Sequence, residues 1–309
     1  MALLLIISSL LAPPPVSNEF AALFKAEEYR YTGGRYENEL FRYRLFVPRR
    51  LEPNKQYPLI VWLHGHGERG SNNKEQLLHL DRIFDRETPE KYRFFMLVVQ
   101  CTEANGCWYQ GGTDQASQSD DMITVAMEIL DKTMRERPVD PDRVYLSGVS
   151  SGGNGCWEAA MRYPELFAAV APMSSGGGDE SRAERLADIP IWAFHSRDDT
   201  CTPPEGVQRM VQAVKEAGGK VHLTLVPTSM HNSLPAAQGD HQIVEWLLSQ
   251  RRTSILWTPP GSSPDWQWWQ VFGVPLALGV LICLGWLSEV RRRRRIRAKE
   301  ADPETIPES

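Results

Sequence analysis

The sequence predicts an α/β fold in which a mostly parallel sheet is covered by helices on both faces. Strand-like runs alternate with helical stretches between residues 41 and 250, a pattern typical of parallel strands joined by crossover helices. Several strand-like runs are nearly continuous apolar segments, as expected of strands buried on both faces. A third observation, a long uncharged segment between Asp265 and Glu289, predicts one additional C-terminal transmembrane helix.

Seven segments rich in β-branched and aromatic residues are expected to form strands, and four segments with helical spacing are expected to form helices. The strands are predicted at 41–47, 59–63, 94–99, 144–147, 168–171, 191–194 and 221–226. The helices are predicted at 120–137, 153–163, 204–217 and 242–250. In the first helix, Met122, Val125, Ala126, Ile129 and Leu130 recur at helical spacing, which predicts one apolar face.

The apolar segment near the C-terminus has the length of a membrane span. Residues 271–287 are almost wholly apolar, and this many helical residues rise roughly 26 Å, close to the ~30 Å hydrocarbon core. We therefore predict a transmembrane helix over residues 266–288. Trp266, Trp268, Trp269 and Trp286 lie near its ends, where indole rings favour the membrane interface.

The charges around this segment predict its orientation. From Arg291 onward the tail has seven basic and four acidic residues, a charge of +3, which leaves −8 for the rest of a chain of net charge −5. Basic residues beside a span stay on the cytoplasmic side. We expect a basic cytoplasmic tail at 289–309, a linker rich in proline, glycine and serine at 251–265, and an extracytoplasmic main domain at 18–250. The acidic main domain argues against nucleic acid as a partner.

The N-terminus carries a short apolar run, residues 2–12, of the length found in signal peptides. It predicts a signal peptide over residues 1–17, although no basic residue precedes the run and three prolines follow it. Without a signal peptide, the alternative is a tail-anchored protein that faces the cytosol.

The cysteines leave the redox state open. Cys283 lies in the predicted span, whereas Cys101, Cys107, Cys156 and Cys201 lie in the main domain. Four cysteines allow three complete pairings, and four free thiols are the alternative. Neither a pair of closely spaced cysteines nor a histidine cluster suggests a metal site, so we expect no metal and no cofactor.

A candidate nucleophile follows the fourth predicted strand. Residues 148–152 read Gly-Val-Ser-Ser-Gly, which matches the Gly-x-Ser-x-Gly pattern of a serine held on a sharp strand-to-helix turn. The pattern alone is weak, but here a predicted strand enters it and a predicted helix leaves it. Ser147 and Ser151 are rivals, but only Ser150 has glycines two positions away on both sides.

A serine hydroxyl needs a base, and the base in turn needs an acid that orients it. In sites built on this turn the acid and then the histidine follow the serine along the chain. His231, just after the predicted strand 221–226, is the candidate base, whereas His222 lies inside that strand and His195 at the end of another, and both are expected to be structural. Asp198 and Asp199 both follow the predicted strand 191–194, and spacing alone does not separate them.

A glycine-rich loop follows the predicted strand 59–63. Residues 63–70 read Leu-His-Gly-His-Gly-Glu-Arg-Gly, and a loop in this place supplies one backbone N–H group of an oxyanion hole. The residue after the nucleophile supplies the other. We therefore expect the N–H groups of His66 and Ser151 to form the hole.

These segments together resemble the α/β-hydrolase esterases. The nearest group is the phospholipase/carboxylesterase and polyhydroxybutyrate-depolymerase-like esterases, which are also similar to prolyl-oligopeptidase-type catalytic domains. The resemblance covers residues 41–248. In that group the segment equivalent to residues 195–199 reads His-Gly-x-x-Asp and its last residue is catalytic, which implies Asp199. Ser196 replaces the usual glycine here.

The resemblance and the residues together predict a serine hydrolase that cleaves a small-molecule or lipid-like carboxylic ester through an acyl-enzyme. Ser150, Asp199 and His231 are expected to form its catalytic triad. One alternative is a membrane-tethered serine peptidase of prolyl-oligopeptidase type, because those domains share the scaffold. Another is a non-catalytic binding module on a hydrolase fold.

Overall fold

The computed structural model describes residues 15–33, 36–83, 91–102, 108, 121–227, 230–234, 237 and 242–252. These residues lie within one compact unit, Met1–Trp257. The predicted transmembrane helix at 266–288 and the basic tail lie outside the described residues, as do almost all of the linker and residues 1–14 of the predicted signal peptide. Within the described ranges, no helix combines the length and the hydropathy needed to span a bilayer.

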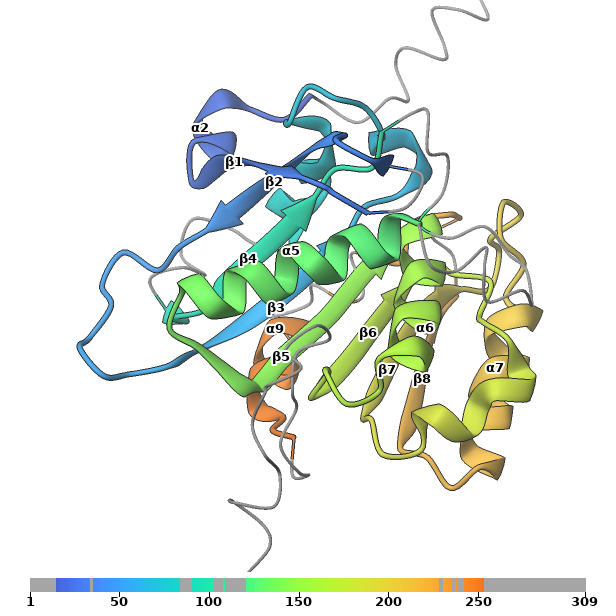
Figure 1. The fold of residues 1–309 in the computed structure, drawn as a ribbon. Coiled ribbons are helices and arrows are strands. Elements are labelled where there is room, and N and C mark those ends of the chain that lie inside the picture. The colour runs from blue at the N-terminus through green and yellow to red at the C-terminus, as the bar shows by residue number, and fades with distance from the viewer. Residues whose placement is uncertain are drawn as a thin grey trace, which may run out of the picture. The chain divides into compact units, whose positions relative to one another are not determined.

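The described residues form an eight-stranded sheet in the order β1-β2-β4-β3-β5-β6-β7-β8 (Figure 1). Strands β1, β2 and β4 pair antiparallel, and every other neighbouring pair is parallel. The prediction of a mostly parallel sheet is therefore confirmed. The strands are β1 (Phe24–Arg30), β2 (Leu40–Phe46), β3 (Tyr57–Leu63), β4 (Phe95–Val99), β5 (Val139–Val149), β6 (Ala169–Met173), β7 (Ile191–Ser196) and β8 (Val221–Val226).

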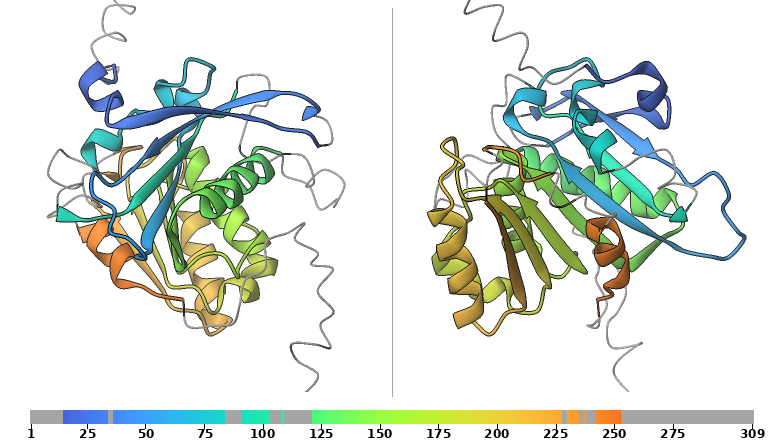
Figure 2. Two further views of the ribbon diagram at one scale, coloured as in Figure 1. Left: turned by 60° about the vertical axis from the view of Figure 1, so that its left-hand side comes forward. Right: turned by 180° about the vertical axis from the view of Figure 1, so that it is seen from behind.

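Helices cover both faces of this sheet, as predicted. The buried side chains of α5 (Met122–Glu136), α6 (Ser151–Arg162) and α7 (Glu205–Glu216) belong to one apolar cluster, and those of α9 (Gln242–Ser249) belong to a second cluster. Figure 1 shows α5 and α6 in front of the sheet and α9 behind it, and the view from behind in Figure 2 brings α9 to the front. Shorter elements are α2 (Asn18–Ala21) and the 3₁₀ turns η2 (His66–Glu68), η3 (Glu75–Leu77), η4 (Leu80–Arg82) and η6 (Glu180–Leu186).

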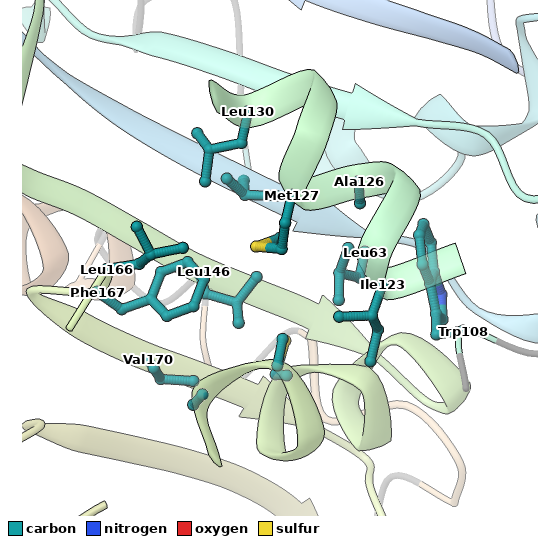
Figure 3. Close-up of a cluster of buried hydrophobic side chains, with 14 of the residues drawn as sticks. Leu63, Trp108, Ile123, Ala126, Met127, Leu130, Leu146, Leu166, Phe167 and Val170 are labelled. Carbon is teal, nitrogen blue, oxygen red and sulfur yellow. The ribbon is translucent and has the colours of Figure 1, made fainter. Parts of the chain in front are cut away.

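The larger apolar cluster holds the helix that carries the candidate nucleophile against the sheet. Leu63 and Leu146 from the central strands meet Ile123 and Met127 from α5 in this cluster (Figure 3). These side chains are buried, and burying an aliphatic side chain of this size contributes about 1.5–3 kcal/mol. Helix α6 adds Cys156, Trp157, Ala159, Ala160 and Met161 to the same cluster, so packing holds this helix against the central strands.

The structure adds one strand to those predicted and lengthens another. Strand β1 was not predicted; it lies at the edge of the sheet, where only Phe24 of its seven residues is buried. Strand β5 begins at Val139, five residues before the predicted start. The prediction missed this part of the strand because Asp-Pro-Asp at residues 140–142 has the composition of a turn.

Candidate active site

Ser150 lies on the sharp turn between β5 and α6. Its φ is 56° and its ψ is −120°, values that a non-glycine residue adopts only where the surroundings enforce them. The flanking glycines allow this turn. A Cβ at Gly148 would lie 2.6 Å from the carbonyl oxygen of Leu63, and one at Gly152 only 2.0 Å from the same oxygen. Neither position tolerates a side chain, so both glycines of the motif are explained by the approach of β3.

The structure brings together the serine, the histidine and one of the two aspartates that the sequence singled out. His231 Nε2 lies 2.8 Å from Ser150 Oγ. His231 Nδ1 lies 2.7 Å from Asp199 Oδ2. A carboxylate oxygen only accepts hydrogen bonds, so Nδ1 carries the proton in the neutral imidazole. Nε2 is then the acceptor for the hydroxyl proton of Ser150.

Asp199 is buried and held in one orientation by its backbone neighbours. Its Oδ1 accepts hydrogen bonds from the N–H groups of Cys201 and Thr202 at 3.0 and 2.8 Å. Its Oδ2 is thereby directed to His231. The Nε2 atom of the buried His195 lies 3.4 Å from the same Oδ2 and 2.8 Å from the carbonyl oxygen of Thr202. His195 therefore contacts the candidate acid but not Ser150 in the described structure, and its expected structural role stays a prediction.

Asp198 has a different set of partners. Its Oδ1 accepts hydrogen bonds from the hydroxyl of Ser196 at 2.5 Å and from the N–H of Met230 at 2.8 Å. Met230 directly precedes His231 and has a positive φ of 50°. Asp198 therefore anchors the backbone of the loop that carries the histidine, whereas Asp199 contacts the imidazole itself. Spacing alone could not have shown this division.

Two buried serines hold the other side of the histidine loop, and no sequence pattern singled out Ser174 as one of them. The N–H of Ser233 donates to Ser174 Oγ at 3.1 Å. The hydroxyl groups of these two serines lie 2.8 Å apart, and Ser233 Oγ donates to the carbonyl oxygen of Phe194 at 3.2 Å. Hydroxyls are common in loops, so no local signal marks this pair. Asp198, Ser174 and Ser233 together fix the loop on both sides of His231.

The two predicted oxyanion-hole donors each lie at the start of a helical turn. Among the described residues, the backbone N–H groups of His66 and Ser151 have no hydrogen-bond acceptor. Ser151 begins α6, where the first-turn N–H groups have no partner within the helix. His66 begins the 3₁₀ turn η2, directly after β3. The two groups come from the two loops that meet at Ser150, since a Cβ at Gly65 would lie 3.5 Å from the Cβ of Ser150.

The candidate triad opens into a cavity of about 430 Å³. This volume is within the range of small-molecule sites. Polar groups line much of the cavity. Its lining residues are Gly65, His66, Gly67, Glu68, His79, Val149, Ser150, Cys201, His231, Asn232 and Leu234.

The two tryptophans near the site, Trp108 and Trp157, are not among the residues that line the cavity. Trp108 and Trp157 are buried in the core, and their indole N–H groups donate to His64 O and Ser175 Oγ. Tyr109 lies outside the described residues. The cavity is accordingly shaped by the loops around Ser150.

The described cysteines form no disulfide with one another. This holds for Cys101, Cys156 and Cys201, and burial raises the pKa of the Cys156 thiol. Cys107 and Cys283 lie outside the described ranges. No group of three or more histidine, cysteine or acidic side chains within those ranges is arranged to hold a metal ion.

Comparison with known proteins places this geometry in a family. Residues 38–272 match the model of the family described as "Putative esterase". Among curated proteins, a bifunctional acetylxylan esterase/xylanase from Neocallimastix patriciarum is 28% identical over 156 residues, which are 50% of this chain and 21% of that protein. A "Putative carboxymethylenebutenolidase" from Salmonella typhi is 29% identical over 126 residues, which are 35% of this chain and 47% of that protein.

Solved structures agree with the fold. A thermostable esterase shares 34% sequence identity with a TM-score of 0.66, and the match covers 75% of this chain and 64% of that one. A ferulic acid esterase shares 17% identity with a TM-score of 0.56 over 73% of this chain and 97% of that one; a likeness at this identity speaks for the fold alone. The chain spans less than half the length of the two curated relatives, so an activity shared with either whole protein is a matter for proposal.

Proposed function

The chain belongs to this esterase family and has an α/β-hydrolase fold, and we propose that it hydrolyses carboxylic esters through an acyl-enzyme formed on Ser150. The single observation that supports this most is the continuous hydrogen-bonded series from Ser150 Oγ through His231 to the buried Asp199. A serine becomes a useful nucleophile only when a base of this kind removes its proton.

In the proposed acylation, Ser150 Oγ attacks the ester carbonyl carbon while His231 Nε2 takes the hydroxyl proton. The carbonyl oxygen becomes an oxyanion, and the N–H groups of His66 and Ser151 donate hydrogen bonds to it. Asp199 stabilises the imidazolium ion that forms. His231 then gives its proton to the alcohol oxygen, the carbon–oxygen bond breaks, and the acyl group remains on Ser150.

In the proposed deacylation, His231 removes a proton from a water molecule, and the resulting hydroxide attacks the acyl-enzyme. The same two N–H groups hold the second oxyanion. Return of the proton from His231 to Ser150 Oγ releases the carboxylic acid. Preorganised donors of this kind are commonly the largest catalytic contribution in acyl transfer.

The polar residues in the cavity wall favour small-molecule esters with polar groups as the substrate class. Burial opposes ionisation of Glu68, but the interaction with the facing His79 acts in the opposite direction, and the net effect lowers the pKa of this carboxyl group. Glu68 therefore presents a negative charge at the cavity wall, and Asn232 adds an amide. Such a wall favours substrates that carry hydrogen-bond donors over purely alkyl esters.

The reaction class is tested by comparing esters with amides that share the same acyl group. Purified enzyme is given nitrophenyl esters of increasing chain length and the matching nitroanilides, with the Ser150→Ala variant as background. We expect ester turnover that exceeds anilide turnover by at least about 100-fold, since the amide leaving group is far poorer and demands more transition-state stabilisation. Preferred cleavage of anilides or peptides would instead support a peptidase.

We also propose that the enzyme is tethered to a membrane by residues 266–288, with its active site outside and residues 289–309 in the cytoplasm. The support is the apolar segment followed by five consecutive arginines at 291–295, which resist translocation. Two residues of the predicted signal peptide belong to the folded domain. Val16 is buried, and the hydroxyl of Ser17 caps α2. A cleavage site ahead of Val16 therefore fits the fold better than one after Ser17.

Protease treatment of intact cells or spheroplasts tests the orientation. We expect the hydrolase domain to be digested while an epitope placed after Ser309 survives, because the arginine cluster keeps the tail inside. A protected hydrolase domain with a digested tail epitope would instead identify a tail-anchored enzyme that faces the cytosol.

A further inference from the structure

The side chain of His64, at the end of β3, is bonded at both ring nitrogens. The N–H of Cys101 donates to His64 Nε2 at 3.0 Å, and His64 Nδ1 lies 2.7 Å from the carbonyl oxygen of Gly65. A backbone N–H is always a donor and a carbonyl oxygen always an acceptor. Nε2 must therefore be unprotonated and Nδ1 must carry the proton. This is the one tautomer of the neutral ring that satisfies both partners.

This tautomer sets the direction of the peptide group that follows. Described peptide bonds are all trans, and in a planar trans peptide the C=O and the next N–H point in opposite directions. The bond from His64 Nδ1 holds the carbonyl group of Gly65 toward the imidazole. The N–H of His66 consequently points away from that ring. His66 lines the cavity beside Ser150, whereas His64 does not.

The surroundings of His64 keep it neutral and immobile. Its ring packs edge-on against Trp108 at 5.0 Å between centroids, and the indole N–H of Trp108 donates to the carbonyl oxygen of His64 at 2.8 Å. The residue is buried, with 1% of its surface exposed. This burial lowers the pKa of His64 to about 4, so the neutral form persists over the range in which a serine hydrolase works.

We propose that His64 is a positioning residue for the oxyanion hole: its Nδ1–H group holds the carbonyl of Gly65, and the N–H of His66 is thereby aimed at the reacting carbonyl oxygen. His64 does not touch the substrate and acts through the backbone alone. The proposal rests on the proposed function, since an oxyanion hole matters only if an acyl group is transferred to Ser150.

Two substitutions separate the two hydrogen bonds of His64. An asparagine amide occupies the place of Nδ1, so His64→Asn keeps a donor for Gly65 and loses the acceptor for Cys101. A glutamine amide reaches the place of Nε2, so His64→Gln keeps the acceptor and loses the donor. The two variants are matched in polarity, and each removes one buried hydrogen bond. They differ in whether the short bond from residue 64 to the carbonyl of Gly65 is kept. The longer bond from the N–H of Glu68 to that carbonyl, 3.4 Å in the structure, is untouched in both variants.

We expect His64→Gln to lower kcat by roughly 10- to 100-fold and to leave KM within about threefold of the wild-type value. This loss of kcat is somewhat smaller than the roughly 10²- to 10³-fold loss that follows complete removal of an oxyanion-hole donor. His64→Asn should keep kcat within about threefold of the wild-type value. A trifluoromethyl ketone, to which a serine hydroxyl adds to give a tetrahedral oxyanion, should show a Ki raised by the same factor as the fall in kcat, and only in His64→Gln.

Urea unfolding of both variants shows whether stability explains the difference. An equal loss of kcat in the two variants, or an unchanged trifluoromethyl ketone Ki in His64→Gln, would overturn the positioning role.

If His64→Gln does not fold, His64→Met replaces it, because methionine lacks the donor and fits irregular interiors. A wild-type enzyme that turns over no ester overturns the proposed function and this role together, whereas an active wild type with an equally active His64→Gln overturns this role alone.

Discussion

Replacing Ser150 with alanine is expected to reduce ester turnover by roughly 10⁶-fold, because residues that act as one catalytic unit lose nearly the whole chemical contribution when the nucleophile is removed. Ser150 Oγ lies 2.8 Å from His231 Nε2, so alanine leaves the imidazole without a proton to accept. The same change should abolish covalent labelling by a fluorophosphonate, which reacts with activated serine hydroxyls.

Ser147 provides a matched control on the same strand. Its hydroxyl is buried and donates to the carbonyl oxygen of Ala171 at 2.9 Å, so Ser147→Ala removes one buried hydrogen bond and leaves Ser150 and its turn unchanged. We expect this variant to be labelled at the wild-type rate and to keep its turnover. Labelling that persists in Ser150→Ala, or that disappears in Ser147→Ala, would contradict the assignment of the nucleophile.

The second large effect is expected at Asp199. In Asp199→Asn the amide oxygen still suits the two backbone N–H donors from Cys201 and Thr202. The NH₂ group would then face His231 Nδ1 and force that nitrogen to be the acceptor. Nε2 would carry the proton and could no longer take one from Ser150. A loss of about 10⁴ in kcat is expected for the wrong tautomer.

Asp198→Asn is the control for this change. An asparagine Oδ1 at position 198 can still accept from the N–H of Met230 and from the hydroxyl of Ser196, as Asp198 Oδ1 does in the structure. The histidine loop therefore keeps its anchor, and we expect kcat to fall by less than about tenfold, the equivalent of roughly one weakened hydrogen bond. Steady-state kinetics that showed the larger loss in Asp198→Asn would reverse the roles of the two carboxylates.

The parallel part of the fold follows from the sequence because its strands are buried on both faces. Strands β3, β4 and β6 are buried along their whole length, and short continuous apolar runs that alternate with helical segments are typical of strands in such a sheet. Strand β1 escaped prediction for the opposite reason. Four of its seven residues are charged, namely Lys25, Glu27, Glu28 and Arg30, and as an edge strand it is stabilised mainly by its pairing with β2.

The candidate site could be predicted only as far as local patterns extend. The glycines of residues 148–152 predict the turn at Ser150, because a sharp turn packed against β3 excludes side chains at Gly148 and Gly152. The choice between Asp198 and Asp199 depends on how the chain turns after β7, and spacing carries no information on that; only the family resemblance favoured Asp199.

The tautomer of His64 was beyond sequence reasoning altogether. It depends on the N–H of Cys101, which lies 37 residues further along the chain. No local pattern around residues 63–70 reveals which backbone group will approach the ring from the neighbouring strand. The glycine-rich loop was therefore recognisable as an oxyanion loop, but the group that orients it was not.

During turnover Ser150 is expected to carry the acyl group covalently. Mass spectrometry of the acid-quenched enzyme can detect this intermediate. The protein is mixed with an excess of a short-chain nitrophenyl ester, quenched within milliseconds to seconds, and digested. We expect the intact mass to rise by one acyl group and the modified peptide to contain Ser150, with no adduct in Ser150→Ala. Turnover of the ester without any adduct, or with the acyl group on another residue, would rule out an acyl-enzyme intermediate on Ser150.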